Sequence, residues 1–462
     1  MCLKEVDKMY KKNIWQKCDS KKMSKIMKFN EKYIKFLSDG KTERECVTLS
    51  KNLAIKYGFK PLEEFETLKA GDKVYVLNKN KNIALFVIGQ KSLVEGMRVL
   101  GAHIDSPRID IKQNPLYEKD GFALLDTHYY GGIKKYQWVT IPLALHGVVC
   151  RKDGSIVHIN IGEDDNDPVF GIGDLLVHLS ADQLNKTAAK VIEGENLDVT
   201  IGSIPLKEED KFSVKANVLR IIKEKYNFEE EDFVSSEIEV VPAGKARSYG
   251  LDLSMVAGYG QDDRVCAFTS LMAILEVENP TYTSCCILVD KEEIGSVGAT
   301  GAQSLFFENT VARLLSKMGL NSFVETRMAM ENSYMLSSDV SAGVDPLYPS
   351  VNETKNAAYL GEGIVFNKYT GSRGKSGCND TNPEFIAWVR KILDEDGIYY
   401  QTAELGRVDQ GGGGTIAYIL GNYNMHVLDA GVAVLNMHAP MEITSKADVY
   451  EAYLSYVSFL TK

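Results

Sequence analysis

Strand-like and helix-like segments alternate along two stretches of the chain, and this alternation limits the possible folds more than any other feature. In the first stretch, residues 83–88 and 98–103 are short, mostly apolar runs typical of buried strands. In the second, helix-like residues 264–277 precede strand-like residues 284–289, and residues 448–460 form a last amphipathic helix. Strands that alternate with helices predict an α/β fold with a mainly parallel central sheet and helices on both faces.

The middle of the chain differs from its two ends. A chain of 462 residues is too long for one ordinary core, so we expect two domains or one domain with a large insertion. Residues 113–246 carry patterns of short strands, together with helical patterns near 174–192 and 214–226. We therefore expect residues 1–112 and 247–462 to form one domain, into which residues 113–246 are inserted as a second.

Composition argues against several classes of protein. The net charge of -10 gives no basic face for nucleic acid. No apolar run is long enough to span a bilayer, and the first residues lack the apolar core of a signal peptide. The 8 cysteines contain no Cys-x-x-Cys pair, so we expect free thiols in a reducing cytoplasm.

Two adjacent carboxylates, Glu292 and Glu293, follow a predicted buried strand and precede glycines. Open α/β sheets bind ligands at the carboxyl ends of their strands. Neighbouring carboxylates repel each other, and burial raises that cost. A metal ion bound by one of them would remove the repulsion and leave the other to move protons. For the pair alone, an ordinary solvated surface is an equally good interpretation.

Further candidate ligands follow other predicted strands or begin a helix. Each alone has a simpler explanation, such as a helix N-cap for Asp262 or a hydrogen-bonded core residue for a single histidine. Together they form a set of imidazoles and carboxylates without a thiolate, which is typical of hydrolytic zinc, manganese or cobalt sites. The members of this set, besides the acidic pair, are His103, Asp105, Asp262, Asp263, Asp339 and His438.

Four segments of the chain carry a family resemblance. They read Gly-Ala-His-Ile-Asp-Ser-Pro-Arg at 101–108, Asp-Lys-Glu-Glu-Ile-Gly at 290–295, Ser-Asp at 338–339 and Asn-Met-His-Ala-Pro-Met-Glu-Ile at 436–443. This order resembles the aspartyl aminopeptidase family, which includes vacuolar aminopeptidase I, over most of the chain. The resemblance implies a two-metal aminopeptidase that acts on peptides, with an α/β catalytic domain and an inserted β-rich dimerisation domain. It also implies a homo-oligomer, typically a tetrahedral dodecamer.

The resemblance gives each candidate a role. Asp262 would bridge two divalent metal ions, with zinc as the expected metal and manganese or cobalt as alternatives. Glu292 would be the general base, and Asp105 would orient the bridging aspartate or a ligand. The residues that complete the two metal shells would be His103 and Asp339 for one ion, and Glu293 and His438 for the other.

Two further regions are candidates for substrate binding. His178 resembles a family histidine that reaches the active site of a neighbouring subunit, and the alternative is a hydrogen-bonded helix residue. Lys368, Arg373 and Lys375 lie in a basic loop, near which the family recognises acidic side chains; the alternative is a solvated loop. Asp345 stands where animal members carry a histidine, which suggests a microbial branch. The preferred amino-terminal residue is therefore expected to be either an acidic one or a neutral or hydrophobic one.

Two other functions remain open from the sequence. An amidohydrolase that acts on N-acylated amino acids could use a similar pair of metal ions. A non-catalytic assembly protein could retain the fold without the activity. The presence of Glu292 and of every expected ligand argues against the second alternative.

Overall fold

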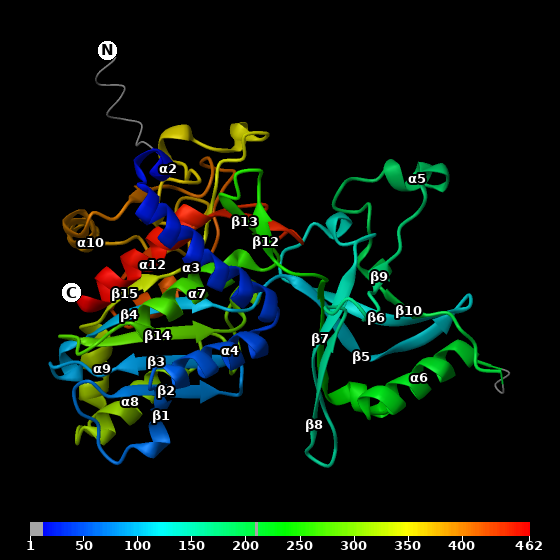
Figure 1. Cartoon of the computed structure of the whole chain (residues 1–462), viewed down its shortest axis with the longest axis horizontal. Coiled ribbons are helices and arrows are strands. Elements are labelled where there is room, and N and C mark those ends of the chain that lie inside the picture. The colour runs from blue at the N-terminus through cyan, green and yellow to red at the C-terminus, as the bar shows by residue number, and fades with distance from the viewer. Residues whose placement is uncertain (1–12, 208–210) are drawn as a thin grey trace. The chain divides into compact units, whose positions relative to one another are not determined.

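The computed structural model describes residues 13–207 and 211–462, which form two compact units (Figure 1). The first unit contains the described residues up to Asp105, together with Ala246–Met437 and Glu442–Lys462. The second unit contains Ser106–Lys245 and His438–Met441. None of the described helices is both long enough and apolar enough to cross a membrane.

The first unit is built on a sheet of nine strands with the order β1-β2-β3-β14-β4-β15-β19-β17-β18. The four central strands, from β14 to β19, are parallel to one another. β3 and β17 run antiparallel to their inner neighbours, so the sheet is mixed, and the expectation of a mainly parallel sheet holds for its centre. In sheet order, the strands span Lys60–Pro61, Lys73–Asn78, Asn82–Val87, Thr283–Val289, Met97–His103, Tyr334–Ser337, His426–Gly431, Ile364–Asn367 and Tyr400–Thr402.

The antiparallel edge has a local cause in the sequence. β2 and β3 are joined by a tight turn, and a short turn can connect only antiparallel strands. Parallel neighbours such as β14 and β4 need a long crossover, which the chain provides through its helices and through the second unit. A smaller five-stranded sheet also belongs to the first unit, in the order β12 (Arg247–Tyr249), β13 (Met255–Gly258), β21 (Glu442–Ser445), β20 (Ala433–Leu435) and β16 (Ser341–Ala342).

Helices cover both faces of the large sheet (Figure 1). Successive side chains of a strand point to opposite faces, and β14 shows this clearly: Cys286 and Leu288 pack in one core, and Cys285 and Ile287 in the other. The first core includes α3 (Ser20–Asp39), α4 (Glu43–Lys56), α7 (Gln261–Leu275), α10 (Pro383–Asp396) and α12 (Lys446–Thr461), and the short α2 (Ile14–Lys17) also packs there. The second core includes α8 (Phe306–Lys317), α9 (Phe323–Glu331) and α11 (Ala417–Gly421).

The second unit is built on a sheet of seven strands, all of whose pairings are antiparallel. In sheet order they are β8 (Ile156–Ile161), β7 (Leu143–Cys150), β11 (Ser236–Pro242), β5 (Arg108–Lys119), β6 (Phe122–Tyr130), β10 (Val199–Gly202) and β9 (Gly171–Ile172). The helix expected near 214–226 is confirmed as α6 (Ser213–Tyr226). That this unit mediates dimerisation stays a prediction.

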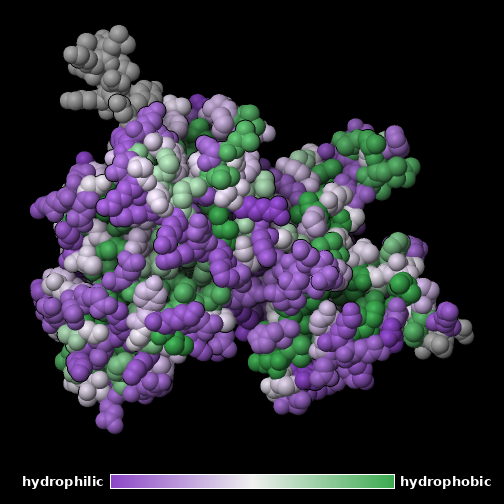
Figure 2. All heavy atoms as spheres, in the orientation of Figure 1, coloured by the Kyte–Doolittle hydropathy of each residue, from purple (hydrophilic) through white to green (hydrophobic). Residues whose placement is uncertain are grey.

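The helix expected near residues 174–192 is wrong for most of that segment. The structure has only a 3-10 turn at Val177–Leu179 and the four-residue α5 (Ala181–Leu184). Val177, Leu179 and Leu184 are 70%, 69% and 66% exposed, and Figure 2 shows hydrophobic residues gathered on the surface there. An apolar pattern stabilises a helix only when that face packs against the rest of the protein, and here it does not.

Candidate metal centre

Three neighbouring parallel strands bring most of the predicted ligands to one edge of the large sheet. β4 ends at His103 and lies between β14 and β15. Glu292 and Glu293 follow the end of β14, and Asp339 follows the end of β15. Because the three strands are parallel, their carboxyl ends meet at the same edge.

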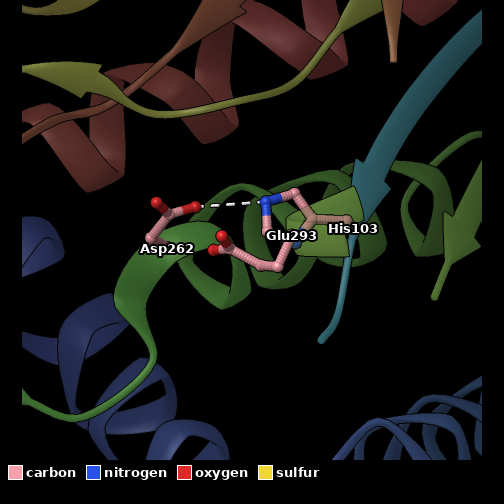
Figure 3. Close-up of side chains that lie close together, drawn as sticks. All are labelled: His103, Asp262 and Glu293. Atoms are coloured by element: carbon pink, nitrogen blue, oxygen red, sulfur yellow. Dashed lines mark hydrogen bonds and ion pairs between the residues drawn. The ribbon is translucent and has the colours of Figure 1, made fainter. Parts of the chain in front are cut away.

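His103 is at the centre of this group of side chains. It is buried, and its Nε2 lies 3.1 Å from Oδ1 of Asp262, which is at the start of α7. Nδ1 lies 3.0 Å from the backbone carbonyl oxygen of Asp105. One candidate ligand atom each of His103, Asp262 and Glu293 lies within 4.8 Å of the others, and Figure 3 shows these side chains facing one another.

A second group shares His103 with the first. His103, Asp263 and Asp339 also offer ligand atoms within 4.8 Å of one another. Asp263 received no role from the sequence, although it forms an acidic pair with Asp262 just as Glu292 does with Glu293. The two groups share His103 and differ in the carboxylates that they offer.

Asp105 supports the backbone of the acidic pair. Its Oδ1 accepts a hydrogen bond of 3.1 Å from the N–H of Glu292, and its Oδ2 accepts one of 3.2 Å from the N–H of Glu293. The pair lies in a short 3-10 turn, η7 (Glu292–Ile294), and the Asp105 side chain is fully buried. Asp105 therefore positions both glutamates through their main chain, in addition to its contact with His103.

Glu442 supports the backbone of Asp262 in the same way, and no local pattern in the sequence singles it out. Its Oε2 accepts hydrogen bonds from the N–H groups of Gln261, at 2.6 Å, and of Asp262, at 3.2 Å. The Glu442 side chain comes from β21, far along the chain from α7, and is buried. Only the pairing of β21 with β13, which precedes α7, brings it there.

The electrostatics of the group favour a bound cation. Burial, together with the charge of Asp262, raises the pKa of Glu293 well above its usual range. Burial and the charge of Asp263 raise the pKa of Asp339 in the same way. Burial opposes a charged His103, but hydrogen bonds to Asp105 and Asp262 outweigh it, so the pKa of His103 is raised.

Burial is the largest cause of the raised carboxyl pKa values, and the neighbouring carboxylates add to it. The group therefore holds several buried carboxylates around one imidazole. A divalent cation would neutralise their charge, and imidazole nitrogen with carboxylate oxygen is a donor set that zinc accepts. The residues present therefore fit a metal site.

His438 is described as part of the second unit. There its Nδ1 lies 2.8 Å from the carbonyl oxygen of Gly132, and the side chain is partly buried. A contact of one ring nitrogen with a carbonyl oxygen is typical of metal-binding histidines, because it orients the other nitrogen. The role of His438 as a ligand stays a prediction.

The predicted substrate residues lie on the surface of the described structure. Lys368 and Lys375 both pair with Asp380, with the Nζ of Lys375 at 3.0 Å, and Lys375 also lies 3.7 Å above the ring centre of Tyr369. Arg373 is exposed in the same loop.

His178 is exposed in the 3-10 turn at Val177–Leu179. The expectation that it lies on a helix is wrong, because that helix does not form. Its role toward a neighbouring subunit stays a prediction.

Sequence comparisons point to one family. A family model described as "Aminopeptidase I zinc metalloprotease (M18)" matches residues 36–460. A protein of Clostridium acetobutylicum named as a probable M18 family aminopeptidase 1 is 61% identical over 454 residues, which cover 97% of this chain and 98% of that protein. A protein of the same name from Borreliella burgdorferi is 45% identical over 455 residues, covering 98% of this chain and 99% of that protein.

Solved structures agree with this result. The crystal structure of an M18 family aminopeptidase from Thermotoga maritima matches with a TM-score of 0.95 and 46% identity, covering 98% of this chain and 99% of that one. Aminopeptidase I of Clostridium acetobutylicum matches with a TM-score of 0.92 and 58% identity, with the same coverage. A structure of the mApe1 dodecamer of S. cerevisiae shares the fold, with a TM-score of 0.75, 20% identity, and coverage of 93% of this chain and 95% of that one.

Proposed function

The chain belongs to the M18 family of aminopeptidases, which are zinc metalloproteases, and we propose that it releases single residues from peptide amino termini using two metal ions and Glu292 as the general base. The buried group of His103, Asp262 and Glu293 carries this proposal, because its ligand atoms lie within 4.8 Å of one another. The proposal extends the family assignment to the number of ions, the role of each residue and the substrate.

The two ions would share Asp262 as a bridging ligand. His103 and Asp339 would complete the shell of one ion, and Glu293 and His438 that of the other. Divalent ions, with zinc first and manganese or cobalt as alternatives, would supply the Lewis acidity that polarises a peptide carbonyl and lowers the pKa of a water molecule to about 7.

The two adjacent glutamates would then divide the work. Glu293 has a buried Oε1 and faces His103 and Asp262, as a ligand should (Figure 3). The Glu292 side chain is 16% exposed, and its Oε2 lies 3.9 Å from the Nε2 of His103. Glu292 is therefore close to the ligand group and still open to water. It would accept the proton of the attacking water and pass it to the leaving amine.

The charged residues around the metal site would set the preference for one substrate over another. A free α-amine would be attracted by the excess of carboxylates, which explains a preference for amino termini. Lys368, Arg373 and Lys375 would attract an acidic side chain, but Asp380 already neutralises part of that charge. We therefore propose that the enzyme accepts acidic and also neutral or hydrophobic amino-terminal residues.

We also propose a homo-oligomer, most simply a tetrahedral dodecamer, in which the second unit dimerises and His178 reaches a neighbouring active site. The related fold of a dodecamer and the exposed apolar side chains beside His178 support this. A cytoplasmic location is supported by the cysteines of the described residues, which are all free.

The test is hydrolysis of a panel of aminoacyl-nitroanilides by metal-free protein supplied with zinc, manganese or cobalt in turn. We expect metal-dependent release of nitroaniline, which is lost when the amine of the same substrate is acetylated. An amidohydrolase would instead release acetate from the acetylated substrates and leave their nitroanilide bond intact. If no substrate is cleaved with any of the metals, the chain is a non-catalytic member of its family.

A further inference from the structure

The turn between β2 and β3 contacts the loop that carries the acidic pair. The sequence 78–82 reads Asn-Lys-Asn-Lys-Asn and joins β2 to β3. In the structure, Nδ2 of Asn78 donates a hydrogen bond of 2.8 Å to the carbonyl oxygen of Ala299. Nδ2 of Asn82 donates one of 2.5 Å to the carbonyl oxygen of Thr300. Both bonds hold the far end of the loop formed by residues 290–301.

Lys81 holds the near end of the same loop. Its Nζ lies 2.8 Å from Oε1 of Glu43, at the start of α4, and 3.5 Å from Oδ2 of Asp290, which directly follows β14. The side chains of Lys81, Glu43 and Asp290 are 10%, 0% and 1% exposed. Buried charges of this kind are retained only when they are paired, so the three side chains constrain one another strongly.

The two ends of the loop are also joined to each other. The Thr300 hydroxyl donates a hydrogen bond of 2.6 Å to Oδ2 of Asp290, and the N–H of Asp290 donates one of 3.3 Å to the carbonyl oxygen of Thr300. Between these ends, the acidic pair is held by Asp105. The loop is therefore held at its base by the turn and at its centre by Asp105.

The charges explain why Lys81 matters more than the two asparagines. Burial and the charge of Glu43 raise the pKa of Asp290 to about 6, and Lys81 acts in the opposite direction. Without Lys81, two buried carboxylates would repel each other at the base of the loop. The cost of that repulsion would be relieved most easily by displacing the loop, because Glu43 is anchored in a helix.

We propose that residues 78–82 form a clamp that sets the position of Glu292 and Glu293, with Lys81 as its main positioning residue. The clamp acts on the geometry of the loop. Only its effect on catalysis depends on the function proposed above.

The test compares hydrogen–deuterium exchange of residues 290–301 in metal-free wild type and in Lys81→Met. A matched control is Lys79→Met, because Lys79 is an exposed lysine of the same turn. We expect faster exchange of this loop in Lys81→Met, with α10 unchanged, and no change in Lys79→Met. Equal exchange of the loop in wild type and Lys81→Met would overturn the proposal.

A second variant and a kinetic readout keep the test decisive. Asn78→Ala removes the hydrogen bond to Ala299 without leaving a buried charge. We expect a smaller increase of exchange in the same loop, and this variant can be measured even if Lys81→Met does not fold.

In steady-state kinetics, Lys81→Met should lower kcat by about 10- to 100-fold with little change in KM, as changes to residues that support metal ligands do. A loss confined to KM would overturn the proposal. An inactive wild type would refute the proposed function alone, because the exchange experiment needs no activity.

Discussion

The acidic loop of the first unit and the segment around α5 in the second are both irregular, yet their surroundings are opposite. Asp105, Asn82 and Lys81 each bind a specific atom of the loop, and the side chains of Asp105, Lys81 and Asp290 are buried. Around α5, Val177 and Leu179 are about two-thirds exposed. The loop therefore owes its shape to contacts within its own unit, whereas the α5 segment carries apolar surface that the described residues of one subunit leave uncovered. Substitutions should therefore act on chemistry in the first region and on assembly in the second.

The largest effect is expected for Glu292→Gln. Replacing the general base by a neutral amide should lower kcat by about 10²- to 10⁴-fold, while zinc content stays unchanged because Glu292 is not a proposed ligand. Steady-state hydrolysis and elemental analysis of the same samples measure both quantities. Glu331→Gln, at an exposed glutamate, is the control. If Glu292→Gln has the kcat of wild type, Glu292 is not the general base.

Glu442→Gln should have the next largest effect. The variant loses the carboxylate charge that strengthens the hydrogen bonds from the N–H groups of Gln261 and Asp262. The position of Asp262 should therefore be less well fixed. We expect zinc affinity or kcat to fall by about 10- to 100-fold. Competition with a coloured chelator measures the affinity. Unchanged affinity together with unchanged kcat would show that Asp262 does not need this support.

Leu179→Asp tests the other side of the comparison. A carboxylate in a buried subunit contact is strongly unfavourable, so the mass of the particle in solution should decrease, while the fold of the subunit is retained. Light scattering measures the mass, and circular dichroism the fold. Ile204→Asp, at another exposed apolar residue of the second unit, is the matched control. If the mass is the same as that of wild type, this surface is not a subunit contact.

The smallest effect is expected for Lys375→Met. Lys375 shares Asp380 with Lys368, and an exposed ion pair is worth at most about 1 kcal/mol. The ratio of kcat/KM for glutamyl to leucyl substrates should therefore fall by no more than about 5-fold. A loss of two orders of magnitude would instead make Lys375 the main determinant of acidic specificity.

The sequence was most informative where a local pattern decides the structure. His103, Glu293 and Asp339 could be placed at one edge because buried parallel strands end just before them. Glu442 and the turn at 78–82 could not, because their contacts join segments far apart in the chain. The helix expected around α5 was wrong because a helical apolar pattern forms a stable helix only if its apolar face packs against other residues. The reversal of β17 against β19 likewise depends on long-range pairing, which periodicity does not show.

If the group around His103 and Asp262 is the metal centre of a peptidase, a zinc titration of the metal-free protein should restore its activity. Native mass spectrometry counts the zinc ions per chain, and aminoacyl-nitroanilide hydrolysis is measured on the same samples. We predict that activity rises as two ions bind, and that Asp262→Asn loses both the binding and the activity. A metal-free protein as active as the loaded one, or an Asp262→Asn variant that binds zinc and turns over as wild type does, would show that this group is not the metal centre.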